Sequence, residues 1–85
     1  MNNVFIKEVI DGEVIEIKQI TVRHIIAISV MPMDKPENKM INLLLALVKV
    51  NDNPLTEQTL LDWTNIKGYT FCQEAINRMI EGLNI

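Results

Sequence analysis

The first twenty residues contain two short runs in which apolar and polar side chains alternate, the period of a half-buried β-strand. The runs flank Asp11-Gly12, a dipeptide that tolerates positive φ and suits a two-residue type I′ turn. We therefore predict a β-hairpin over residues 3–20, with one face resting on helices because an isolated hairpin is marginal in water. The turn predicts these cross-strand pairs: Val9 with Val14, Lys7 with Glu16, and Ile6 with Ile17.

The alternation stops at Ile20, and Thr21 can serve as the N-cap of a first helix that Pro32 ends. The many Ile and Val residues of this segment would also suit a strand. We favour a helix because the period-2 pattern is lost. Residues 32–38, with two prolines and mixed charge, form a predicted loop.

The segment MINLLLALVKV predicts the core of a second helix, which begins near Glu37 and ends at Val50. At about 100° per residue, its apolar side chains cover roughly two-thirds of the helix circumference, whereas one core contact needs about a third. Such a helix is buried on more than one side. It is either the central helix of the core, the simpler interpretation, or it shares a face with another chain. Because a small domain has little material to cover two helix faces, we expect an exposed apolar patch here.

Thr56 can cap a short third helix over residues 57–63, and residues 64–69 are a predicted turn. Thr70 and Gln73 form a capping-box pattern that opens a last helix, which Gly82 terminates. This helix has one apolar face: Phe71, Cys72, Ala75, Ile76, Met79 and Ile80. The sequence predicts an α+β fold, in which an N-terminal β-hairpin precedes a small bundle of about four helices. Residues 1–85 form one domain, with 21–85 as the helical part.

Composition narrows the classes of partner. Hydrophobic residues are 48% of the chain and aromatic residues only 5%, so the core is aliphatic, and a domain this small commonly gains stability from a second copy. We therefore expect a homo-oligomer. The net charge of −3 and the scattered Lys and Arg residues argue against nucleic acid and anionic membranes. The N-terminus does not have the pattern of a signal peptide, and the apolar stretch is shorter than the ~20 residues of a membrane span. The single cysteine is consistent with a cytoplasmic protein.

Candidate chemistry is sparse. His24 is the only histidine, and the residues around it in sequence are Arg23 and aliphatic side chains. Cys72 falls on the apolar face of the last helix, where a thiol usually behaves as a small hydrophobe. One Cys and one His do not make a metal site, and the three glycines sit at predicted turns and caps rather than in a phosphate loop. Trp63 and Tyr69 are expected to pack between the last two helices. We expect no enzyme, no metal and no cofactor.

The candidate partner-binding residues come from the broad apolar arc of the second helix and from the two methionines that flank the start of the preceding loop. Methionine is over-used at adaptable binding surfaces. These candidates are Met31, Met33, Met40, Ile41, Leu44, Leu45 and Val48.

The order of elements resembles the small tail assembly chaperones of long-tailed bacteriophages and prophages. The matching segments, spread over residues 12–80, are GEVIEIKQITVRHI, INLLLALVKV and PLTEQTLLDWTNIKGYTFCQEAINRMI. Members often have a hydrophobic-Thr-Val-Arg-Glu helix start. Here it is Ile20-Thr21-Val22-Arg23, with His24 where an acid is common.

The resemblance implies a non-enzymatic role in the cytoplasm of a host cell. Such chaperones bind the long, aggregation-prone tape measure protein and keep it in solution until the tail tube assembles around it. The alternative from a different class is a small cytoplasmic homo-oligomer with a structural or regulatory role.

Overall fold

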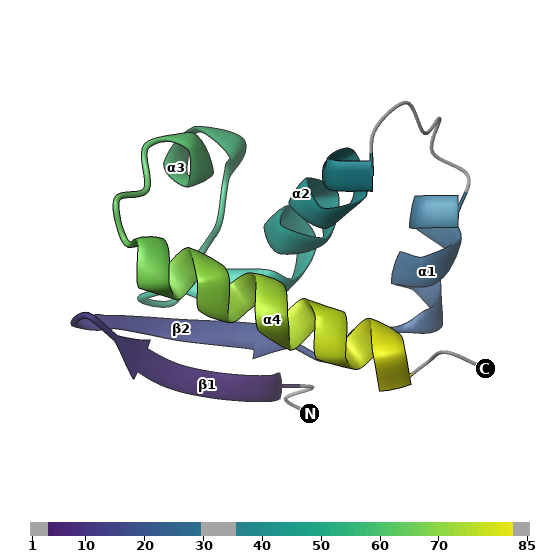
Figure 1. Ribbon diagram of the computed structural model, residues 1–85, viewed down its shortest axis with the longest axis horizontal. Coiled ribbons are helices and arrows are strands. Elements are labelled where there is room, and N and C mark those ends of the chain that lie inside the picture. The colour runs from purple at the N-terminus through teal and green to yellow at the C-terminus, as the bar shows by residue number, and fades with distance from the viewer. Residues whose placement is uncertain (1–3, 30–35, 83–85) are drawn as a thin grey trace.

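The computed structural model describes residues 4–29 and 36–82 of the 85-residue chain. The helices lie on one side of a single antiparallel sheet with strand order β1-β2-β3-β4 (Figure 1). The predicted α+β class, with an N-terminal hairpin followed by helices, is confirmed. The elements are β1 (Val4–Ile10), β2 (Glu13–Lys18), α1 (Val22–Ser29), α2 (Pro36–Leu47), β3 (Val48–Val50), β4 (Asn53–Pro54), α3 (Glu57–Leu61) and α4 (Ile66–Gly82).

The hairpin has the predicted register. The pairs Val9–Val14, Lys7–Glu16 and Ile6–Ile17 all form between β1 and β2. Asp11 and Gly12 have φ values of 49° and 84°, as a type I′ turn requires. The pairing has one irregularity near the start of β1. The register shifts between Val4 and Ile6, which makes a β-bulge at Phe5.

The end of the predicted second helix was wrong. Helix α2 stops at Leu47, and residues 48–50 form β3, which pairs with β2 through Ile17–Val48 and Ile15–Val50. Val-Lys-Val is β-branched and alternating, so it suits a strand once β2 offers a free edge. The chain then turns at Asn51 and Asp52, which both have positive φ, into the two-residue strand β4.

Helix α1 forms as predicted rather than extending the hairpin as a strand. The predicted loop over 32–38 is too long at its C-terminal end, because α2 begins at Pro36. Proline is favoured at the first helical position, where its missing N–H has no intrahelical partner to lose. The predicted helix end at Pro32 lies outside the described residues.

Thr56 caps α3 as predicted, and its Oγ1 accepts the N–H of Thr59 at 3.1 Å, but the helix ends at Leu61 rather than residue 63. The predicted start of the last helix was also wrong. Helix α4 begins at Ile66, so the predicted turn over 64–69 is largely helical and Thr70 lies inside the helix. Asn65 precedes the first helical residue, and its Oδ1 accepts the N–H of Gly68 at 2.9 Å, the bond of an N-cap.

Asn65 also joins the helices to the hairpin. Its Nδ2 donates to the carbonyl of Ile10 at 2.9 Å and to Oε1 of Glu13 at 2.8 Å. The same Glu13 oxygen accepts the indole N–H of Trp63 at 2.8 Å. Trp63 therefore packs against the core, as expected of a packing residue, and in addition bonds the start of β2.

The core lies between the sheet and the helices α2 and α4. Its buried residues are Ile15, Ile17, Ile20, Leu43, Leu44, Leu47, Val48, Leu55, Cys72, Ala75, Ile76 and Met79. The predicted apolar face of α4 supplies four of these residues, whereas Phe71 is half-buried and Ile80 is 42% exposed. No helix within the described ranges is both long enough and apolar enough to cross a membrane.

Candidate partner-binding surface

Two of the predicted binding residues belong to the core. Leu44 is fully buried and Val48 is 2% exposed, so neither lies on a surface that a partner could reach. Leu44 belongs to the core cluster, and Val48 starts β3 opposite Ile17. The helix is apolar around much of its girth because the fold covers it from several directions, which the hydrophobic pattern could not distinguish from a shared face.

The other predicted residues of this helix are at its margin. Met40, Ile41 and Leu45 are half-buried, and Met40 and Leu45 pack against the core cluster. Met31 and Met33 lie outside the described residues. Helix α2 therefore offers a partner only a narrow, partly covered apolar surface.

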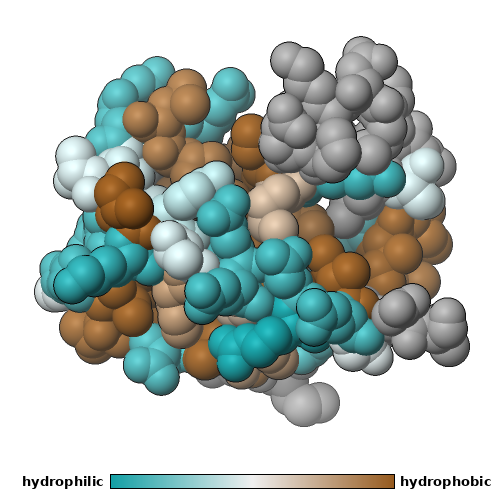
Figure 2. Space-filling view, in the orientation of Figure 1, coloured by the Kyte–Doolittle hydropathy of each residue, from teal (hydrophilic) through white to brown (hydrophobic). Residues whose placement is uncertain are grey.

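A more exposed apolar surface lies on α1. Val22 is 69% exposed, Ile25 38% and Ile26 57%, and their i, i+3, i+4 spacing places them on one side of the helix. We call these three residues the α1 stripe. Apolar side chains gather over α1 in the space-filling view, at the right of Figure 2. The spacing is visible in the sequence, which predicts a helix here but does not show which of its sides is exposed.

The first turn of α1 is held by His24. Its Nδ1 accepts the backbone N–H of Thr21 at 3.1 Å and lies 2.9 Å from Oγ1 of Thr21. An acid at this third helical position makes the same bond to the N-cap N–H in a capping box. Nδ1 can accept an N–H only when it carries no hydrogen itself, so this bond requires the tautomer with the hydrogen on Nε2. His24 is therefore a capping residue in this structure.

Cys72 is fully buried in the core. Desolvation raises the pKa of its thiol from 9.0 to about 12. Since the thiolate is the nucleophilic form, this side chain is a poor nucleophile near neutral pH.

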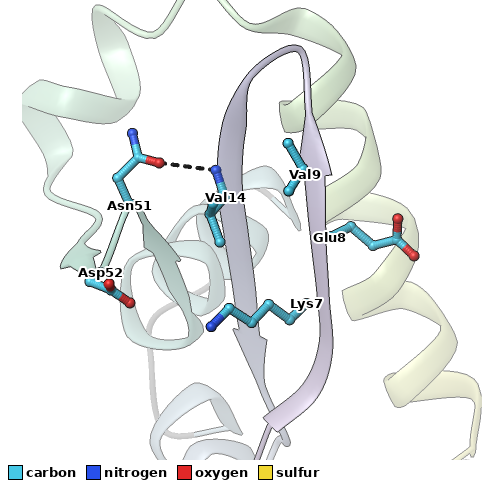
Figure 3. Close-up of a pocket in the computed structure, with 6 residues that line it drawn as sticks. All are labelled: Lys7, Glu8, Val9, Val14, Asn51 and Asp52. Atoms are coloured by element: carbon cyan, nitrogen blue, oxygen red, sulfur yellow. Dashed lines mark hydrogen bonds between the residues drawn. The ribbon is translucent and has the colours of Figure 1, made fainter.

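An open depression lies on the face of the sheet that points away from the helices. It has a volume of about 660 Å³, and its lining is Lys7, Glu8, Val9, Val14, Asn51 and Asp52. In Figure 3 the Lys7 side chain extends from β1 toward Asp52, and Glu8 points to the other side of the strand. Asn51 joins β2 to the following turn: its Oδ1 accepts the Val14 N–H at 3.0 Å, and its N–H donates to the Val14 carbonyl at 2.8 Å. Within the described residues, no group of three or more His, Cys, Asp or Glu side chains could hold a metal ion.

Comparison of the chain with protein-family models, with curated proteins and with solved structures finds no match.

Proposed function

We propose that this protein is a phage or prophage tail assembly chaperone, and that it binds helical segments of a tape measure protein through the α1 stripe. The observation that carries the proposal is the exposure of Val22, Ile25 and Ile26 on one side of a single helix. Single exposed apolar residues are normal on a protein surface, but three at helical spacing form a continuous strip.

The strip matches the chemistry of such a client. A coiled-coil or amphipathic helix has an apolar face that must be covered when its own partners are absent, and recognition of such a helix uses apolar anchors at i, i+3 and i+4 spacing. Helix α1 packs on α2, and the three residues of the α1 stripe are exposed to solvent.

The role of His24 also supports the proposal. The resemblance to tail chaperones departs at this position, where an acid is common. An acid there would accept the N–H of the N-cap residue, and the His24 imidazole accepts that same N–H from Thr21. The substitution therefore retains the capping bond that shapes the start of α1.

The experiment first searches the genes beside this one for a very long coiled-coil reading frame, and then co-expresses the protein that this frame encodes, as the candidate client, with the present chain. The soluble fraction of that protein should rise with the wild-type chain present. The double variant Val22→Glu/Ile26→Glu should lose the effect, because two charges would stand on the apolar contact. The matched control is Leu61→Glu/Ile66→Glu, which alters two residues that are 71% and 68% exposed but lie on α3 and α4.

Each outcome has one meaning. Equal client solubility with and without the wild-type chain contradicts the function. Equal loss of solubility in both double variants contradicts the assignment of the contact to α1.

A further inference from the structure

The free edge of β1 has no neighbouring strand within the described part of the chain, because β1 is the outermost strand of the sheet. It is seven residues long and, apart from Lys7 and Glu8, apolar. Proteins usually protect an edge of this kind with proline, lysine, a covering element or a bulge, because its unpaired backbone groups attract another strand. In β1 the bulge at Phe5 and Lys7 lie in the first four residues, and the last three residues carry neither device.

The hydrogen bonds of Val14 show which backbone groups point outward. Its N–H and carbonyl both bond to Asn51, on the β3 side. In an antiparallel sheet, the N–H and the carbonyl of one residue point to the same neighbouring strand. Since those of Val14 point to β3, they do not bond β1, and Val14 and its β1 partner Val9 are a non-hydrogen-bonded pair. The N–H and carbonyl of Val9, and by alternation those of Lys7, therefore point to the free edge.

We propose that this edge pairs with β1 of a second copy, antiparallel, with the two Val9 residues opposite each other. The Val9 side chain is 64% exposed. Of the two residues whose backbone groups point to the free edge, Val9 and Lys7, Val9 is the apolar one. Its N–H and carbonyl bond reciprocally to those of the partner's Val9. This pairing also places each Lys7 beside the oppositely charged Asp11 of the other copy.

Charge and strand geometry exclude the neighbouring registers. Only Lys7 and Val9 have backbone groups that point to the free edge, so the bonded pairs between the two copies can be 7 with 7, 7 with 9, or 9 with 9. The two-fold axis then falls at Lys7, Glu8 or Val9, respectively. An axis at Lys7 sets two lysines opposite each other and requires the bulged residue Phe5 to bond Val9. An axis at Glu8 sets two carboxylates opposite each other in the closely spaced, non-hydrogen-bonded type of pair. Only the Val9 register avoids like charges on the axis.

A cysteine scan tests the register. In a hydrogen-bonded antiparallel pair the opposed Cα atoms are about 5.5 Å apart, within the range that a disulfide spans. Under mild oxidation Val9→Cys should form a covalent dimer faster than Lys7→Cys, Glu8→Cys or the remote control Leu61→Cys. The native Cys72 is fully buried and does not compete. If Lys7→Cys or Glu8→Cys cross-links faster than Val9→Cys, the proposed register is wrong. If Val9→Cys cross-links no faster than Leu61→Cys, the proposed interface is wrong.

A second measurement uses the protein without added cysteines. Sedimentation equilibrium should show a concentration-dependent dimer, and Val9→Lys should raise its dissociation constant about tenfold or more by placing like charges on the axis. Leu61→Lys, with the same charge change at a 71% exposed site, should leave the constant unchanged. A wild-type chain that stays monomeric at all concentrations overturns the proposal. The inference does not depend on the chaperone function, since the edge variants change the mass in solution whereas the α1 variants change client solubility.

Discussion

Gly68 of α4 lies directly against Ile15 of β2. A Cβ built on Gly68 would be 2.7 Å from Cδ1 of Ile15 and 2.9 Å from Nδ2 of Asn65, and both distances are shorter than the non-bonded contacts that Cβ atoms make in proteins. Ile15 is fully buried and Asn65 is held by bonds to the hairpin, so neither side chain can move aside easily. The close approach of the helix to the sheet at this point requires glycine.

Gly68→Ala should therefore lower the free energy of unfolding by about 1–3 kcal/mol, because overpacking outweighs the gain in helix propensity. Ile15→Val removes the Cδ1 atom that the new methyl group would meet. The double variant should therefore lose less free energy of unfolding than the two single variants lose together. Gly82→Ala, which meets nothing within 4 Å, is the control. Additive costs in urea denaturation would contradict the proposed contact.

The two neighbouring leucines of α2 should differ. Leu44 is fully buried and Leu45 is half-buried, although the hydrophobic pattern of the sequence does not distinguish them. Leu44→Ala should cost about 2–5 kcal/mol through the lost burial and the cavity, and Leu45→Ala clearly less. Chemical denaturation of both variants measures the difference, and equal costs would mean that α2 is enclosed on both sides.

Asn65 should contribute to the free energy of unfolding through both its amide oxygen, which caps α4, and its amide nitrogen, which bonds the hairpin. Asn65→Ser retains an oxygen that can cap α4 but loses the donors to Ile10 and Glu13, and Asn65→Ala loses both functions. We expect stability to fall in the order Asn, Ser, Ala, with the last step costing about 0.5–2 kcal/mol. Fluorescence of Trp63, the only tryptophan, follows unfolding in the same region. A serine variant as stable as the wild type would show that the bonds to the hairpin contribute nothing.

The buried thiol should make stability depend on alkaline pH. In the unfolded chain Cys72 loses its proton near pH 9.0, whereas in the folded chain its pKa is about 12. Between these values the unfolded state binds fewer protons than the folded state, so stability falls as pH rises. From pH 8 to pH 10 the loss should be about 1 kcal/mol greater for the wild type than for Cys72→Ala. Parallel pH profiles of the two proteins would contradict the assignment.

The cap of α1 can be tested through His24. His24→Ala should remove the acceptor for the Thr21 N–H and lower the helical signal of α1, at a cost of about 0.5–1 kcal/mol. His24→Glu retains an acceptor at the same helical position and should recover most of that loss. If alanine and glutamate behave alike, the bond to Thr21 does not stabilise the helix.

The sequence by itself determined the parts of this protein that depend on neighbours along the chain. Asp11-Gly12 set the hairpin turn and with it the register of β1 on β2 from Ile10 back to Ile6, because a two-residue turn leaves only one pairing. Thr56 likewise set the start of α3, since a cap acts within one helical turn.

The tertiary structure decided what depends on distant partners. Residues 48–50 carry a pattern that suits either helix or strand, and the free edge of β2 made them a strand. Asn65 became the cap of α4 while it also held the carbonyl of Ile10, 55 positions away. The surface followed the same logic: the apolar arc of α2 was covered by the sheet and α4, and the α1 stripe was left exposed. Burial is settled by packing in three dimensions, whereas turns and caps are settled by local backbone geometry.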